Sequence, residues 1–163
     1  MPSISRTRQL SGLAGWFVLM VVVAVLGAVA SVNAGDFYQS LARPGWAPPA
    51  NLFGPAWTTL YTLMAVAAWL VWRSHGLRNT ALTLFLVQLA PNVLWSWLFF
   101  VWQLGALSFV NIAVLWGLIF ATVIAFWRLQ RTAALLLVPY LLWVTFAAAL
   151  NFAVWQMNPQ LLG

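Results

Sequence analysis

Side chains that can transfer protons or hold metals are very few in this 163-residue chain. It contains one acid, Asp36, one histidine, His75, and no cysteine. Paired-carboxylate catalysis, thiolate chemistry and metal sites built from acidic and histidine side chains are therefore excluded. A Ser-His-Asp arrangement would need two residues that fall in separate loops. Because the sequence also has no phosphate-binding loop, zinc motif or nucleophile elbow, we do not expect an acid-base or metal-dependent enzyme.

Aromatic and amide side chains are the remaining candidates. Many of them fall inside long apolar runs, where an indole N–H has no water to bond and needs another partner. Core packing would explain any one tryptophan, and interhelical hydrogen bonds would explain the amides. Together these residues also suit a cavity that binds a flat apolar ligand by stacking and a few hydrogen bonds. They are Trp57, Gln88, Asn92, Trp95, Trp97, Asn111, Trp116, Trp143 and Asn151.

The composition requires that these residues lie in a lipid environment. The chain is 64% hydrophobic and 5% charged, with a mean hydropathy of +0.94, whereas a soluble domain carries about 25% charged residues. The formal net charge of +6 does not indicate a nucleic-acid partner, because the seven basic residues are spread along the chain in ones and twos. The chain is therefore predicted to be an integral membrane protein.

Five apolar runs are long enough to cross a bilayer, which takes about 20 residues. Charged residues mark their limits, because a charge at the bilayer centre costs about 2.5–3.5 kcal/mol. The run between Arg78 and Arg128 is too long for one crossing and divides at Gln103. We predict an all-α fold, an integral membrane bundle of five transmembrane helices that forms one domain over residues 1–163. The predicted spans are 13–32, 55–72, 80–102, 106–127 and 133–155.

The arginines are distributed unequally between the two sides of such a bundle. Six of the seven would face one side, and only Arg43, offset by Asp36, would face the other. The positive-inside rule then places the N-terminus in the cytoplasm and the C-terminus outside. The rival interpretation is a secretory signal peptide cleaved near Ala30 or Ala34. The first apolar run is longer than the about 7–15 residues of a signal core, which favours a span.

The only long connection, residues 33–54, is predicted to form a lid over the bundle. Pro44, Pro48 and Pro49 restrict the backbone, while Tyr38 and Trp46 offer broad apolar faces with one polar group each. The alternative for Trp46 is an anchor at the lipid headgroups. A belt of interfacial tryptophans is also predicted near the span ends, at Trp16, Trp72, Trp102, Trp127 and Trp155.

Two further patterns lie inside the predicted spans. Pro91 removes one backbone hydrogen bond just before Asn92, so the third span is expected to bend there and to widen a cavity. Small residues recur at every fourth position of the fourth span, a stripe that lets another helix approach closely. Spacing alone leaves open whether that partner helix belongs to this chain or to a second copy. The stripe is Ala113, Gly117, Ala121 and Ala125.

Five blocks, in order along the chain, resemble the translocator protein family, also called the tryptophan-rich sensory protein or peripheral benzodiazepine receptor family. The blocks are FYQSL and RPGWAPP at 37–41 and 43–49, PAWTTLYTLM at 55–64, QLAPNVLWS at 88–96 followed by two phenylalanines, VPYLLW at 138–143, and FA with LNF at 146–147 and 150–152. The resemblance runs from about residue 35 to about residue 155. It implies a five-helix membrane bundle that is often a homodimer.

The resemblance also implies a ligand and the residues that bind it. The family binds porphyrin-type tetrapyrroles such as protoporphyrin IX, and drug-like apolar aromatic ligands. Trp57 and Trp143 would donate their indole N–H groups to the ligand, and Ala147 would leave room for it. With Trp46 of the lid added, the expected ligand-binding residues are Tyr38, Trp46, Pro48, Trp57, Tyr61, Asn92, Trp95, Trp143, Phe146 and Ala147.

The chain departs from the family at two places. It has Pro91 where leucine is common, and it lacks the tyrosine and basic residue of the cholesterol-recognition stretch near Phe152 and Gln156. Cholesterol transport is therefore not expected. A sensor of tetrapyrroles in a bacterial inner membrane is the leading hypothesis, with no cofactor beyond that ligand. Light- and oxygen-dependent degradation of porphyrin, or transport of tetrapyrrole or lipid intermediates, are the alternatives.

Overall fold

A computed structural model describes residues 5–163, and all the regular structure in that range is helical. Five of its helical segments are long and apolar enough to cross a membrane, so the predicted fold class is confirmed. Their bounds are Arg6–Ala30 (α1), Ala50–His75 (a 3-10 turn, η1, Ala50–Leu52, followed by α3, Phe53–His75), Thr80–Val101 (α4, Thr80–Ser96, followed by η2, Trp97–Val101), Gly105–Leu129 (α5) and Arg131–Met157 (α6).

The helix ends follow from identifiable residues. The Asn79 side chain accepts a hydrogen bond from the Leu82 backbone N–H and caps the start of α4. Gly76 ends α3 with a φ of 72°, a conformation that costs glycine little. Pro55, the predicted first residue of the second span, lies in the first turn of α3, which begins two residues earlier. Each long helical segment overlaps one predicted span, and the largest difference is at the first, which begins at Arg6 rather than at residue 13.

The connection 33–54 was predicted to be a loop throughout. In the structure it contains the short helix α2 (Ala34–Ser40) and η1. Asp36 in the first turn of α2 favours a helix start, but seven residues are too few to show a helical periodicity. The third span is also not a uniform α-helix, because η2 is a π-helical turn. A four-residue helix, α7 (Pro159–Leu162), follows α6. None of these short elements was predicted from the sequence.

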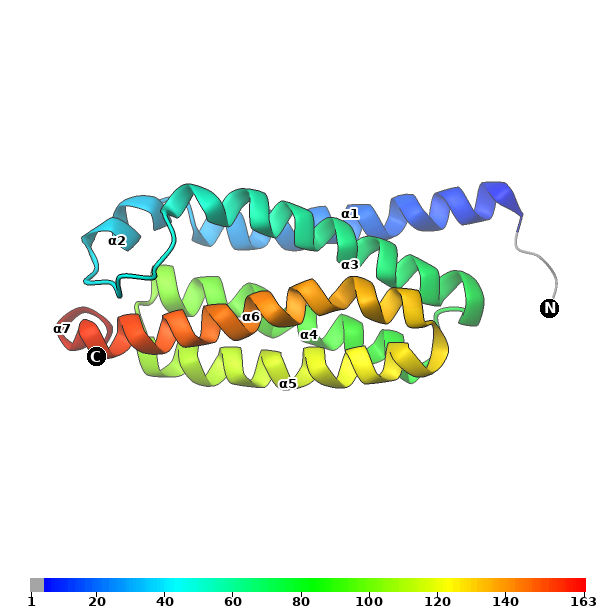
Figure 1. Ribbon diagram of the computed structural model, residues 1–163. Helices are drawn as coiled ribbons and strands as arrows, with labels where there is room; N and C mark the ends of the chain where they lie inside the picture. Colours follow the sequence, from blue (N-terminus) through cyan, green and yellow to red (C-terminus); the bar gives the residue numbers. More distant parts are fainter. Residues whose placement is uncertain (1–4) are drawn as a thin grey trace.

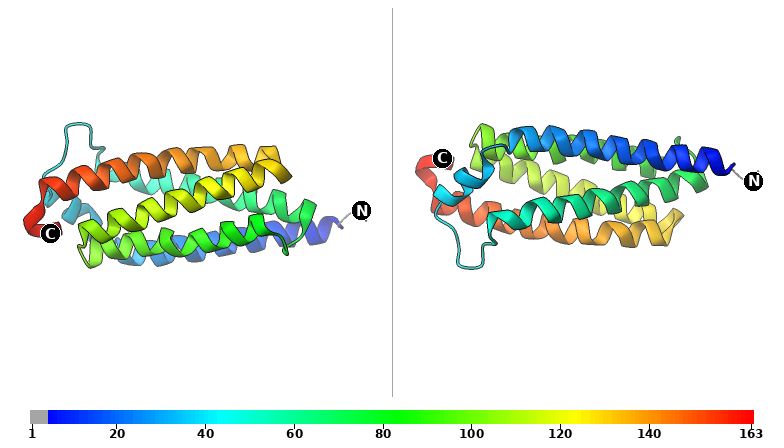
Figure 2. Two further views of the ribbon diagram at one scale, coloured as in Figure 1. Left: turned by 90° about the horizontal axis from the view of Figure 1, so that it is seen from below. Right: turned by 90° about the horizontal axis from the view of Figure 1, so that it is seen from above.

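The five spans form a closed ring in the order α1, α3, α6, α5, α4. Figure 1 shows α1 and α3 side by side above the other three, with the N-terminus and C-terminus at opposite ends. Figure 2 shows that α1 and α3 converge at the N-terminal end and diverge toward the end that carries α2. Gly12 makes the convergence possible, because a Cβ at this position would overlap the ring of Trp72.

The half of the bundle near the N-terminus is a solid core. Ala65, Ala67 and Ala68 of α3 are completely buried, and they let the neighbouring helices pack closely. Phe85 of α4 stacks on Phe126 of α5 at 5.9 Å between ring centroids. Trp16 is only 7% exposed and packs edge-on against Phe85, so its predicted place in an interfacial belt is wrong. Trp102 and Trp127, by contrast, are about half exposed.

Candidate ligand-binding cavity

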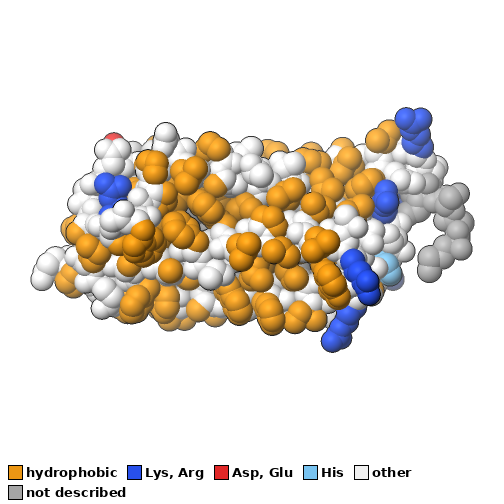
Figure 3. Space-filling view, viewed as in Figure 1, with side chains coloured by type: hydrophobic (Ala, Val, Ile, Leu, Met, Phe, Trp, Pro, Cys, Tyr) orange, Lys and Arg blue, Asp and Glu red, His pale blue; other side chains and the backbone are white. Residues whose placement is uncertain are grey.

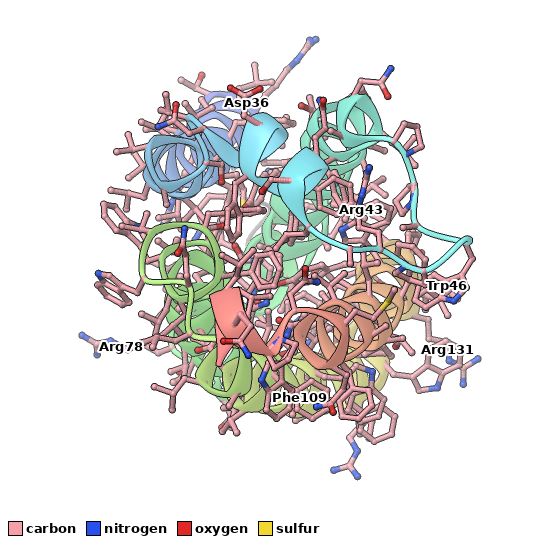
Figure 4. The ribbon with its side chains drawn as sticks, turned by 90° about the vertical axis from the view of Figure 1, so that its left-hand side faces the viewer. Asp36, Arg43, Trp46, Arg78, Phe109 and Arg131 are labelled. Carbon is pink, nitrogen blue, oxygen red and sulfur yellow. The ribbon has the colours of Figure 1, made fainter. Side chains whose placement is uncertain are left out.

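The other half of the bundle encloses a cavity of about 550 Å³. This volume falls within the range of pockets that bind drug-sized molecules. All five spans contribute to its wall, and α2 lies over its end between α1 and α3 (Figure 4). None of the residues that line it is charged or is a histidine.

Aromatic rings form much of the wall. Trp57 stacks on Tyr61, with ring centroids 5.4 Å apart and an angle of 30° between the planes. Phe53 packs edge-on against both Tyr38 and Trp143, at 5.3 and 6.0 Å. The first pair lies within α3, and the contacts of Phe53 join α3 to α2 and α6, so that these rings restrain one another in the cavity wall.

A chain of hydrogen bonds leads from the cavity wall into the core. The Tyr61 hydroxyl donates to Asn92 Oδ1 at 2.8 Å, and Asn92 Nδ2 donates to the Tyr140 hydroxyl at 2.7 Å. The Tyr140 hydroxyl in turn donates to Gln88 Oε1 at 2.7 Å. Within residues 5–163, Gln88 Nε2 is the one buried side-chain nitrogen or oxygen without a partner. These hydrogen bonds join α3, α4 and α6. Because the Tyr61 hydroxyl uses its hydrogen to donate to Asn92, it can act toward a ligand only as an acceptor.

The tryptophans of the wall fall into two groups. Trp95 Nε1 donates to Asn151 Oδ1 at 2.9 Å, so its polar group is already satisfied within the protein. Trp57 and Trp143 also line the cavity, but neither indole nitrogen has a hydrogen-bond partner among the described residues. An N–H in an apolar wall without a partner favours a ligand that brings an acceptor. Among the described lining residues, Trp57 and Trp143 therefore keep an unused donor, and Tyr61 keeps acceptor capacity.

The end of the cavity nearest α2 is closed by contacts between sequence-distant residues. The Tyr38 hydroxyl donates to the Pro48 carbonyl at 3.0 Å, which ties α2 to the loop that follows it. Asn158, just after α6, accepts from the Ala42 backbone N–H and donates to the Ala42 carbonyl, both at 2.8 Å. The Arg43 guanidinium lies 4.7 Å from the centre of the Tyr38 ring. The loop is thus fastened to α2 on one side and to the end of α6 on the other.

The structure brings most of the predicted binding residues to this cavity. Seven of the ten line it, namely Tyr38, Trp57, Tyr61, Asn92, Trp95, Trp143 and Ala147. Pro48 contributes its carbonyl to Tyr38 instead, and Phe146 packs behind the wall between Trp143 and Trp46. Trp46 is 52% exposed, and Figure 4 shows it at the edge of the bundle, where the loop swings outward.

Several lining residues had no place in the sequence prediction. Phe99 and Phe100 lay within a matched block, and their contacts with Trp95, at 5.3 and 5.6 Å, make them part of the aromatic wall. The residues from α1 could not be identified, because α1 is apolar on every side and has no periodicity that marks an inner face. Pro91 lies inside α4 without a π turn at its position, and its carbonyl accepts from Asn111 Nδ2 at 2.9 Å.

The fold and the cavity define a class of protein, namely a multi-pass α-helical membrane protein whose five spans line an aromatic pocket. Comparison with known proteins then identifies the family. The model of the TspO/MBR family matches residues 16–156, and the chain belongs to that family.

Named relatives are similar over most of their length. The protein CrtK of Rhodobacter capsulatus is 40% identical over 146 residues, which cover 87% of this chain and 91% of the relative. The tryptophan-rich protein TspO of Chlorobaculum tepidum is 42% identical over 127 residues, or 76% and 80% of the two chains. The human translocator protein is 36% identical over 126 residues, or 75% of each chain.

Proposed function

We propose that this membrane protein binds porphyrin-type tetrapyrroles, such as protoporphyrin IX, and other flat aromatic ligands in the cavity, and that it acts as a sensor of them. One observation carries the proposal. The cavity is uncharged and aromatic, and it is lined by Trp57 and Trp143, whose indole N–H groups have no hydrogen-bond partner among the described residues. A flat macrocycle with polar groups at its edge would stack on the rings and accept from these donors. The pyrrole N–H groups of such a ligand would find their acceptor at Tyr61.

The test is a titration of the purified protein with protoporphyrin IX in the dark, followed through the absorbance of the porphyrin. Loss of one hydrogen bond weakens binding by about 0.5–1.5 kcal/mol, so Trp57→Phe and Trp143→Phe are each expected to raise Kd about 2- to 10-fold. Trp127→Phe serves as the control, because Trp127 is exposed on α5 and does not line the cavity. No saturable binding by the wild-type protein would contradict the proposal.

Illumination of the same samples separates the sensor from a porphyrin-degrading activity. Binding without loss of pigment supports the sensor. Photochemical degradation would instead be indicated by a loss of pigment that requires Trp57 or Trp143 and that free tryptophan in detergent does not reproduce. In that reaction the ligand and oxygen supply the reactive chemistry.

The location and orientation of the protein belong to the same proposal. We place it in a bacterial inner membrane with the N-terminus in the cytoplasm. Arginine side chains gather at the N-terminal end of the bundle (Figure 3), and Asp36 and Arg43 lie at the opposite end (Figure 4). The positive-inside rule then puts α2 and the nearby end of the cavity on the outer side of the membrane.

We also propose that the protein forms a homodimer through α5. The first two residues of the small-residue stripe face outward, since Ala113 and Gly117 are exposed and nothing lies within 4 Å of where a Cβ on Gly117 would be, whereas Ala125 packs against the core of this chain. Within residues 5–163, no helix covers that position. A second copy would give the close helix contact that such stripes favour.

A further inference from the structure

The exposed residues of the cavity wall lie on only two helices. Most residues that line the cavity are buried or half-buried. The exposed ones are Val21 and Ala28 of α1, with Gly54, Thr58 and Thr62 of α3. None of the lining residues from α2, α4, α5 or α6 is exposed. The cavity therefore opens along the line between α1 and α3.

The path of these two helices explains the opening. They are in tight contact near the N-terminal end, where Gly12 lies against Trp72 and Trp69 Nε1 donates to the Gln9 carbonyl at 3.0 Å. Beyond that point they diverge (Figure 2). We call this opening between α1 and α3 the slot. On α1 it runs from Val21 to Ala28, a distance of about 10 Å at 1.5 Å per residue. It lies in the outer half of the spans, beside the cavity.

The slot faces lipid rather than water. Val21 is 58% exposed. Val25 and Val29, about one and two turns further along the same side of α1, are 54% and 56% exposed. The hydroxyls along the α3 side are bonded to their own helix, Thr58 to the Gly54 carbonyl and Thr62 to the Thr58 carbonyl, both at 2.9 Å. Neither threonine hydroxyl is therefore a free donor, so an apolar molecule passes them without desolvating one.

The end that faces water is closed. Tyr38 of α2 is 4% exposed and lines the cavity from that side, and its hydroxyl is bonded to the loop. We infer that ligands enter the cavity sideways from the bilayer through the slot between α1 and α3, so that the class of ligand is an amphiphile dissolved in the membrane rather than a solute from the water phase. This inference rests on the proposed binding function.

The test blocks the slot after the protein has folded. The chain has no cysteine, so a single introduced thiol is the only target of a bulky methanethiosulfonate reagent, and a reductant removes the group again. Thr58→Cys places the group at the slot. Thr59→Cys is a matched control, because Thr59 is also exposed, also bonds back to its own helix at 2.9 Å, and does not line the cavity. Gln39→Cys, on the exposed side of α2, places the group over the water-facing end.

The readout is the rate of tryptophan quenching when protoporphyrin IX is added to protein in phosphatidylcholine vesicles. Access through the slot predicts that labelled Thr58→Cys binds and releases the porphyrin at least tenfold more slowly, with Kd nearly unchanged, and that reductant restores both rates. Labelled Thr59→Cys and Gln39→Cys are expected to bind as the wild type does.

The other outcomes are distinct. Unchanged rates in labelled Thr58→Cys, faster release at an unchanged rate of binding, or slowing only in labelled Gln39→Cys would each overturn the inference. The last result would assign access to the α2 end. Absence of saturable binding in the unlabelled wild type would instead overturn the proposed function on which this inference depends.

Discussion

Tyr38 connects the water-facing end of the cavity to the loop above it through a single hydroxyl. Its hydrogen bond to the Pro48 carbonyl requires the protonated phenol. Burial raises the pKa of the Tyr38 hydroxyl above its ordinary value of 10.0, and the hydrogen bond and charge of Arg43 oppose that rise. Tyr38 is therefore neutral at physiological pH, and its bond to the loop is intact there.

The raised pKa has a definite consequence for stability. Because the folded-state pKa is above the unfolded value, the contribution of Tyr38 is fully present below about pH 10 and is lost as the pH rises through the folded pKa. Tyr38→Phe is expected to lower the stability by about 0.5–1.5 kcal/mol at pH 7. That difference from the wild type is expected to vanish at higher pH.

Thermal unfolding of both proteins in the same detergent, from pH 7 to pH 11.5, measures this difference. The tyrosines of the spans, Tyr61 and Tyr140, are present in both proteins, so their own titration cancels in the comparison. A difference that stays constant across this range would show that the hydroxyl of Tyr38 contributes nothing that depends on its proton.

Single residues also show how far a sequence can define the site. The positions of Trp57, Trp95 and Trp143 within apolar runs are readable from the sequence, and so is the need of each indole for a partner. Which of them finds one is not readable, because it depends on a residue 56 positions away, Asn151, whose amide accepts from Trp95. Trp57 and Trp143 are distinguished from Trp95 only by packing in three dimensions.

At the scale of elements, the contact of α1 with α3 depends on the absence of one side chain. A Cβ on Gly12 would overlap the Trp72 ring, and Trp72 lies in the last turns of α3 and packs against the hydrophobic core. Gly12→Ala is therefore expected to lower the free energy of unfolding by about 1–3 kcal/mol, the usual effect of overpacking.

Gly15→Ala is the matched control for this substitution. Gly15 lies one turn further along α1, and nothing is within 4 Å of where its Cβ would be. Alanine there has only its higher helix propensity to contribute, so stability is expected to be unchanged or slightly raised. Both variants are compared by unfolding in a mixed micelle. Equal stability of the two variants would mean that Trp72 moves aside at no cost.

The elements differ in how well the sequence predicts them. The five spans were predictable because their length and apolar composition are set by the bilayer, whatever their neighbours are. The short helices α2 and α7 and the π turn of η2 were not, because each is stabilised by contacts with distant segments. Phe37 of α2, for example, packs against Phe99 of η2 at 6.2 Å. The cavity wall contributed by α1 was missed for another reason, because α1 is apolar on every side and no periodicity marks its inner face.

For the molecule as a whole, the two halves of the bundle differ in how closely they are packed, and this difference gives them different roles. The N-terminal half is filled by residues such as Met64 and Phe85, which are completely buried. The other half holds the cavity, and α1 and α3 separate there. A solid half fixes the helices relative to one another, so the wall of the cavity keeps its shape without a ligand. Such a preformed pocket loses little entropy when it binds a rigid planar molecule.

The assembly of two copies can be tested at the same scale through α5. Gly117 lies on the outward face of this helix, and open space surrounds the position of its missing Cβ. Leucine therefore fits in the monomer without a clash, but it would hold a second helix away from the backbone of α5. Gly117→Leu is expected to shift the protein from dimer to monomer while its thermal stability and its binding of protoporphyrin IX as a monomer are retained.

Cross-linking in the native membrane, together with the mass of the purified protein in detergent, measures this shift. Gly15→Leu is the control, because Gly15 is also an exposed glycine with open space around it but lies on α1, on a different face of the ring. Dimers that persist in Gly117→Leu and disappear in Gly15→Leu would move the interface from α5 to α1. In that case the second copy would sit beside the slot between α1 and α3, and dimer formation would then control access to the cavity.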